Sequence, residues 1–255
     1  MRADDHRELW ARYQRLCSLL ATAAVRGANP DAASTIVVEQ FIAGDEVAFE
    51  GLLVAGELNC ITIFAKPDPL EGPFFAETIY VTPSGLSDDV EQAIFDAVSA
   101  AAAAIGLVEG PVHAELRLSE AGPVVLELAA RSIGGLCSRT LRYGAGVSLE
   151  ELVISHAIGR PMPDNGDVAT ASGVMMLPVP RAGVLREILG EGDARSVDHI
   201  RDVAITARVG DTVAPLPEGN TYLGFVFATA ETADDVIRSL RLAADALRFR
   251  ILPRL

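Results

Sequence analysis

The sequence predicts an α+β fold in which helices flank antiparallel sheets. The first observation is a series of short strand-like runs separated by tight turns, an arrangement typical of antiparallel neighbours. The second is a set of longer segments with helical spacing or helix-capping residues, at 5–25, 88–105, 150–159 and 234–247. Strands and helices occur in both halves of the chain, so we expect helices packed on sheets throughout.

The N-terminal part is predicted to begin with a helix and to continue as an antiparallel meander. An apolar stripe at helical spacing runs through 5–25 and ends before the glycine and proline of 27–30. Apolar or β-branched runs separated by short turns follow at 35–42, 46–54 and 57–65. The prolines of 66–73 exclude a strand there, whereas 74–81 is strand-like again.

A further hairpin is expected where the runs 111–118 and 123–129 are joined by a short turn. Side chains alternate between the two faces of a strand. His113, Glu115 and Arg117 therefore share one face, and the apolar residues between them occupy the other.

The composition of 160–166, rich in proline, glycine and polar residues, is typical of a linker. We therefore predict a boundary that divides the chain into 1–165 and a small α+β module, 166–255. The run 222–230 in this module is apolar on both faces, so it should lie centrally in its sheet beneath the helix 234–247.

Length and composition indicate a folded protein. The chain has 255 residues, of which 50% are hydrophobic and 22% charged, and this excludes general disorder. No apolar run reaches the ~18 residues that a membrane span needs, and the charged N-terminus is unlike a secretory signal. Cys17, Cys60 and Cys137 have neither disulfide nor zinc-site spacing. We expect a cytoplasmic protein with no membrane partner.

The charge balance argues against nucleic acid as a partner. The formal net charge is −14, whereas phosphate backbones are bound by clustered lysine and arginine. Lys66 is the only lysine, and the other basic side chains are arginines. In its proline-rich loop, Lys66 is either a solvated residue or a residue that borders a ligand site.

The candidate chemistry centres on Glu115 and Glu127, which the predicted hairpin places on adjacent strands. Neighbouring strands lie ~4.8 Å apart, so two carboxylates on one face would repel unless a proton or a cation lay between them. Magnesium takes oxygen ligands of this kind. The alternative is a pair of surface acids in an acidic protein. His113 shares their face, but magnesium prefers oxygen, which makes it the weaker candidate ligand.

Arg131 follows Glu127 at alternating spacing and precedes a glycine turn at Gly134 and Gly135. A cation next to backbone amides in a turn suits stabilisation of a phosphoryl or acyl-phosphate group. Upstream, the run Glu39-Gln40-Phe41-Ile42 is followed by a second acid, Glu46.

Taken together and in this order, these motifs resemble the later part of an ATP-grasp enzyme, and in particular the carboxylate-amine ligase branch of L-amino-acid ligases and carnosine-synthase-like proteins. The resemblance runs from about residue 35 almost to the C-terminus. It implies that Glu39, Gln40 and Ile42 form the adenine-binding hinge and that Glu46 holds the ribose hydroxyls. It also implies that Glu115 and Glu127 bind magnesium, and that Arg131 contacts the transferred phosphoryl group or the acyl substrate.

The resemblance implies an ATP- and Mg²⁺-dependent ligase, with Mn²⁺ as a possible substitute, that joins a small carboxylate to an amine through an acyl phosphate. Amino acids are the expected substrates, and a homodimer or a separate N-terminal component is the expected partner. The alternative is a non-catalytic remnant that binds nucleotide weakly or acts as a partner protein.

Two departures from the family pattern bear on this choice. Ala129 stands where many ATP-grasp proteins carry an asparagine ligand, so we expect a modified metal site. The lysine-bearing lobe that precedes the hinge in family members has no counterpart here, and we therefore expect the chain alone to be a poor catalyst.

Overall fold

The computed structural model describes residues 1–22, 34–70, 72–161 and 170–254. Its helices and strands in chain order are α1 (His6–Leu20), β1 (Asp45–Val54), β2 (Glu57–Ala65), β3 (Ile79–Thr82), α3 (Asp88–Ala104), β4 (Gly110–Ser119), β5 (Gly122–Ala129), α4 (Arg139–Ala145), α5 (Leu149–Ala157), β6 (Ala171–Leu177), β7 (Gly183–Leu189), α6 (Glu191–Ser196), β8 (Ile200–Ile205), β9 (Thr212–Val213), β10 (Gly224–Ala230), α7 (Ala233–Ala246) and β11 (Arg248–Leu252).

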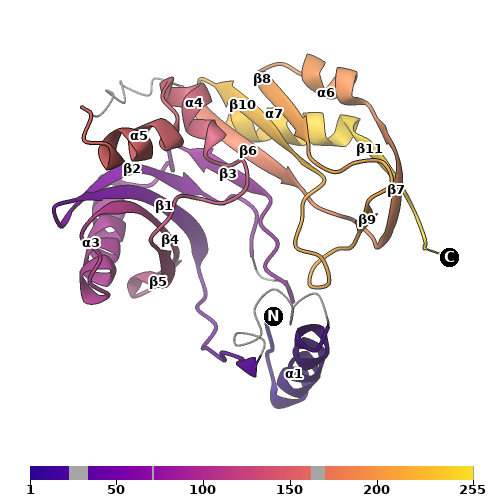
Figure 1. The fold of residues 1–255 in the computed structure, drawn as a ribbon, viewed down its shortest axis with the longest axis horizontal. Coiled ribbons are helices and arrows are strands. Elements are labelled where there is room, and N and C mark those ends of the chain that lie inside the picture. Colours follow the sequence, from indigo (N-terminus) through magenta and orange to yellow (C-terminus); the bar gives the residue numbers. More distant parts are fainter. Residues whose placement is uncertain (23–33, 71, 162–169, 255) are drawn as a thin grey trace.

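The main sheet has eight strands in the order β5-β4-β1-β2-β3-β6-β10-β8, and each neighbouring pair is antiparallel. A smaller sheet has the order β11-β7-β9. Figure 1 shows the main sheet curving across the molecule, with α1 set apart from it beside the loops. The predicted α+β fold is confirmed.

Strand alternation in β1 and β4 places an apolar core on one face of the sheet and the charged side chains on the other. The apolar side chains of β1 and β4 pack with Ile94, Val98 and Ala102 of α3 in a buried core. The amphipathic spacing of α3 and its three acids in the first turn match a helix that begins at residue 88 and covers a sheet. The charged side chains of β1 and β4 therefore lie on the opposite face, where Ala48 shares a buried cluster with Leu141 of α4 and Leu149 of α5.

In the second half of the sheet, α7 packs against β6 and β10. Its inward residues Val236, Leu240 and Ala243 are fully buried. Gly173 of β6 permits this close approach, because a Cβ there would lie 2.7 Å from a methyl group of Val236. The run that we expected to be central is β10, which lies between β6 and β8 and is buried along its whole length. That prediction is confirmed.

The predicted strand at 35–42 is wrong. These residues form no strand, and Val37 and Val38 are 73% and 68% exposed. The reason lies in the sheet order: β1 already pairs with β2 on one edge and with β4 on the other, so the segment just before β1 cannot pair with it. The expected strand at 74–81 shrinks to the four residues of β3. The short elements α4, α6, β7, β9 and β11 were not predicted.

The predicted linker and boundary fall mostly on 162–169, which lie outside the described residues, as does the expected helix stop at 27–30. The main sheet extends over both proposed parts, because β3 pairs with β6. The division into 1–165 and 166–255 stays a prediction.

The packing of α7 is testable with two leucines of the same helix. Leu240 is fully buried and Leu242 is 53% exposed. Leu240→Ala should lower the free energy of unfolding by about 2–5 kcal/mol, because it removes buried methyl groups and leaves a cavity. Leu242→Ala should change it by no more than about 0.5 kcal/mol. Urea denaturation of both variants measures the difference, and equal effects would contradict this packing.

Candidate active site

Three pairs of directly opposite residues place the charged side chains of β1 and β4 on one face. Glu46 is directly opposite Arg117, Ala48 is opposite Glu115, and Glu50 is opposite His113. On the other side of β4, Glu115 is the partner of Glu127 in β5, and His113 is the partner of Ala129. The site therefore follows from the alternation of two strands and from their register with a third.

Lys66, one residue past β2, is the cation at the centre of this face. Its ammonium group lies 2.7 Å from Glu46, 2.7 Å from Glu77 and 3.2 Å from Glu115, and its side chain is only 3% exposed. Burial by itself would lower the pKa of Lys66, but the three carboxylates outweigh it and raise that pKa. Lys66 is therefore charged and holds acids from three separate segments together.

Glu115 and Glu77 respond differently to this environment. Burial tends to raise the pKa of Glu115, but His113 and Lys66 outweigh it and lower the value to about 2. Burial dominates at Glu77, where it raises the pKa although Lys66 opposes the change. The Tyr80 hydroxyl also donates to Glu77 at 2.5 Å. Glu115 is thus the carboxylate held most firmly in its charged form.

Arg117 links the charged face of β1 and β4, called the acid face below, to the segment before β1. It contacts Glu46 at 3.1 Å and donates to the backbone carbonyls of Ile42 and Leu70 at 2.9 and 2.7 Å. Its guanidinium also lies over the ring of Phe41, at 4.9 Å from the centroid. A buried arginine with this many partners fixes the backbone on both sides of the site.

Glu50 and His113 form a second buried pair. Glu50 is 1% exposed, accepts from the backbone N–H of Ile133 at 3.1 Å, and is hydrogen-bonded to Nδ1 of His113. Burial raises the pKa of Glu50. Burial would lower the pKa of His113, but its interactions with Glu115 and Glu50 raise it to about 9. The pair connects β1, β4 and the segment that follows Arg131.

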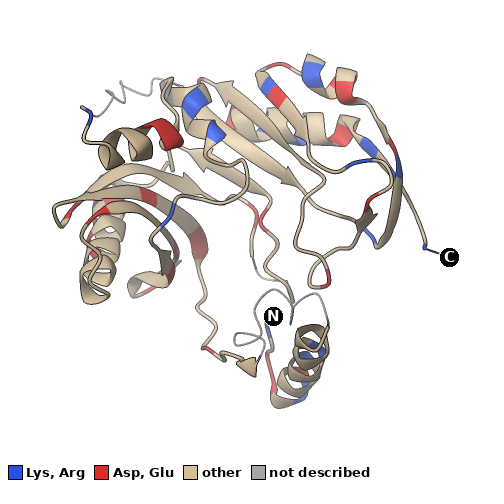
Figure 2. Cartoon of the chain, in the orientation of Figure 1, with Lys and Arg blue, Asp and Glu red and all other residues tan. Residues whose placement is uncertain are grey.

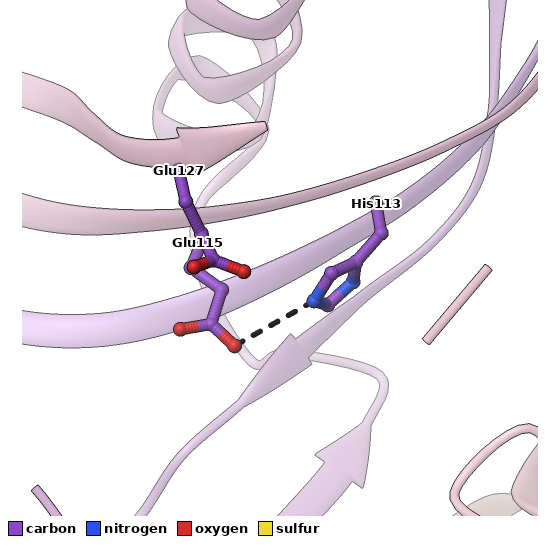
Figure 3. Close-up of side chains that lie close together, drawn as sticks. All are labelled: His113, Glu115 and Glu127. Atoms are coloured by element: carbon purple, nitrogen blue, oxygen red, sulfur yellow. Dashed lines mark ion pairs between the residues drawn. The ribbon is translucent and has the colours of Figure 1, made fainter. Parts of the chain in front are cut away.

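The metal candidates Glu115 and Glu127 come together as expected from the hairpin. Figure 3 shows their carboxylates and the His113 ring turned toward one another, and one ligand atom from each lies within 4.8 Å of the others. A second such group joins Glu46, Glu77 and Glu115. Two carboxylates at this separation form a donor set that fits a divalent cation with oxygen preference.

Arg131 lies just beyond the end of β5, and its guanidinium is 3.7 Å from Glu127. It is about half exposed and donates to the carbonyl of Ser132. The turn that follows contains Gly135 at φ +65°, a conformation that favours glycine.

Two cavities meet at the acid pair. The larger, of about 670 Å³, is bordered by Glu39 and Glu46, by the loop around Phe75, and by residues 214–222 before β10. The smaller, of about 380 Å³, is bordered by Arg131, His113 and the glycine turn. Four residues border both cavities: Glu77, Glu115, Glu127 and Tyr222.

The expected adenine-hinge residues are only partly gathered at the larger cavity. Glu39 borders it, whereas Gln40 is exposed and is not among its lining residues. The backbone carbonyl of Ile42 accepts a hydrogen bond from Arg117. Glu46 borders the cavity, but its carboxylate is paired with Lys66 and Arg117.

Sequence reasoning missed the partners that hold the acids. Glu50 and Arg117 were not candidates, and Lys66 was left between a site role and a surface role. A usable signal existed for two of them, because Glu50 and Arg117 are charged residues that alternate with apolar ones inside strands with a buried apolar face. The pairing of Lys66 with Glu77 carried no such signal.

Two protein-family models match different parts of the chain. The model of the ATP-grasp domain matches residues 1–140, which is more than half of the chain. The chain belongs to the ATP-grasp family. The model of the L-amino acid ligase C-terminal domain 2 matches residues 175–251 of this ATP-grasp protein.

Individual relatives point to the same branch. An L-amino acid ligase from Bacillus licheniformis has a TM-score of 0.83 and 28% identity to the chain, covering 98% of it and 62% of the ligase. The alanine–anticapsin ligase of Bacillus subtilis is 31% identical over 113 residues, which are 43% of this chain and 23% of that protein. An uncharacterized protein of Sinorhizobium fredii, y4rH, is 26% identical over 86% of this chain and 45% of its own length. The ATP-grasp chain spans less than half the length of these curated relatives.

The ion pairs of Lys66 can be tested by removing its charge. Lys66→Met should lower the free energy of unfolding by about 3–5 kcal/mol, because it leaves buried carboxylates without their cation. Arg241→Met is the control: it removes a half-exposed cation that lies 2.6 Å from Asp68, and it should cost less than about 1 kcal/mol. Thermal and urea denaturation measure both. A Lys66→Met protein as stable as the parent would show that Lys66 does not neutralise the acid face.

Proposed function

We propose that this ATP-grasp chain is an ATP- and Mg²⁺-dependent carboxylate-amine ligase, or the later part of one, that acts on amino acids through an acyl phosphate. The observation that carries the proposal is the pair of cavities joined at Glu115 and Glu127. A nucleotide in the larger cavity and a carboxylate substrate in the smaller one would meet at these acids. Phosphoryl transfer requires this arrangement, because both reactants must be held in line.

The larger cavity is assigned to the nucleotide. It combines apolar and aromatic residues, such as Leu70 and Phe75, with the acids Glu39 and Glu46. An apolar wall suits an adenine ring, and carboxylates accept hydrogen bonds from ribose hydroxyls. Arg117 supports this end of the cavity, since it holds the carbonyls of Ile42 and Leu70.

The metal site is assigned to Glu115 and Glu127, whose directly opposed carboxylates fit Mg²⁺ and would also accept Mn²⁺. When bound, the cation neutralises phosphate charge as the phosphoryl group transfers. The low pKa of Glu115 supports the assignment, because a ligand carboxylate must be ionised.

The smaller cavity is assigned to the amino acid substrates. Arg131 is half exposed at its border, so its guanidinium is available to the oxygens of the acyl substrate or of the transferred phosphoryl group. Glu77 borders both cavities and is suited to an ammonium group of a substrate. The remainder of the lining includes the apolar side chains of Ile133, Met176 and Phe225, which exclude water.

A second candidate function is nucleotide binding without turnover, with catalysis requiring a separate component. The observation that favours it is the state of Lys66. The only lysine of the sequence is buried and occupied by three carboxylates, so it does not project freely toward a phosphate.

The two candidates are separated by measuring binding and turnover on the same protein. Titration with a fluorescent ATP analogue should show Mg²⁺-dependent binding that weakens at least ~10-fold in Glu115→Gln and Glu127→Gln, because each removes a charged metal ligand. Glu120→Gln, in the exposed turn of the same hairpin, is the matched control and should bind like the parent.

Amino-acid-dependent release of ADP is then assayed. We expect turnover far below the ~10 per second of an ordinary enzyme, since no free lysine grips the phosphates. Turnover near that value would establish the ligase and contradict the binding-only candidate. A parent protein with no Mg²⁺-dependent nucleotide binding would contradict both.

A further inference from the structure

His113 occupies a position from which it can reach the same cation as the two acids. Its cross-strand partner in β5 is Ala129, whose methyl group offers no ligand at that position. Figure 3 shows the His113 ring directed toward Glu115, and Nε2 lies 3.6 Å from Oε1 of Glu115. This is longer than an ordinary hydrogen bond. It is close to the ~3 Å that separates adjacent ligands of one octahedral ion with bonds of ~2.1 Å.

Glu50 gives the imidazole the support that metal-binding histidines usually have. Its carboxylate is 1% exposed and is hydrogen-bonded to Nδ1, and it is itself held by the backbone N–H of Ile133. A carboxylate on one ring nitrogen fixes the tautomer and orientation of the ring, and so directs the other nitrogen at the metal. Here that other nitrogen, Nε2, faces Glu115.

The charge of the surroundings also suits a divalent cation. With His113 deprotonated, as coordination to a metal requires, the formal charge of this face is −2, because five carboxylates are set against three cations. The carboxylates are those of Glu46, Glu50, Glu77, Glu115 and Glu127, and the cations are Lys66, Arg117 and Arg131. One divalent ion would bring the face to neutrality.

We propose that His113 is a third protein ligand of the divalent cation held by Glu115 and Glu127, and that Glu50 is the positioning residue that orients it. The inference rests on the proposed function and extends it to the identity of the metal. A nitrogen donor favours Mn²⁺ or Co²⁺ over Mg²⁺. On binding, the cation takes the place of any proton on Nε2, which passes to solvent.

The direct test is pulsed electron paramagnetic resonance of the full chain loaded with Mn²⁺. The parent protein should show the nitrogen modulation of a coordinated imidazole. The modulation should be absent from His113→Gln and retained in His156→Gln, a control that alters a histidine paired with Glu109 that lines neither cavity. A parent spectrum without nitrogen modulation, or no Mn²⁺ binding at millimolar concentration, overturns the proposal. So does a modulation that survives in His113→Gln.

Calorimetric titration tests the selectivity and the role of Glu50. His113→Gln should weaken Co²⁺ binding ~10–100-fold and Mg²⁺ binding much less, and Glu50→Gln should weaken Co²⁺ binding ~10-fold and reduce the nitrogen modulation. Circular dichroism establishes that both variants are folded. Equal losses for Co²⁺ and Mg²⁺, or none, contradict the proposal.

These readouts use no nucleotide and no substrate. Nitrogen coordination in a protein that fails to bind ATP would leave the metal site standing and refute the proposed function. Mg²⁺-dependent ATP binding without nitrogen coordination would refute the role of His113 as a metal ligand and leave the proposed function standing.

Discussion

Neutralisation of buried negative charge is the constraint on which this structure depends. Acids from β1, from the loop before β3 and from β4 converge on one ammonium group, that of Lys66. Carboxylates that are mostly removed from water repel one another and would otherwise take up protons. Lys66 places a positive charge beside all three carboxylates, and Arg117 contacts Glu46 from the other side. The acid face is thereby available to a cation and to the ligands that a cation brings.

The rigidity of that face comes from the apolar side of the same strands. Glu46 and Glu50 of β1 and the charged residues of β4 alternate with buried residues that pack under α3. A shift of one residue in register would exchange the two faces, so the packing energy of the core also fixes the positions of the carboxylates. Stability and chemistry thus depend on one sheet. The four residues shared by the two cavities lie where this sheet meets the segments before β3 and β10.

Membership of the ATP-grasp family accounts for the antiparallel architecture of the main sheet. Two regions matched by different family models, 1–140 and 175–251, share one continuous eight-stranded sheet. The chain covers 62% of the Bacillus licheniformis ligase at a TM-score of 0.83. Within that shared fold, His113 lies opposite Ala129 and is hydrogen-bonded to the buried Glu50, next to the acids proposed to hold the metal.

Local pattern alone determined the α+β class, the hairpin of β4 and β5, the helices α3 and α7, and the approach of Glu115 to Glu127. These features depend on spacing within a short stretch of chain, which periodicity and turn residues specify. The apolar run at 35–42 had the composition of a strand, but whether a strand forms depends on a free sheet edge. Both edges of β1 are taken.

Only the tertiary structure decided what surrounds the acids. Glu50 meets His113 and Ile133 across 63 and 83 positions of sequence, and Arg117 meets Ile42 across 75. No local spacing encodes such contacts, because they arise from the register of β1 with β4 and from the path of the loops. The identity of the residues fixed which chemistry was possible at this site. The distances between them and their shielding from water, which determine the charge each group carries, came from the fold.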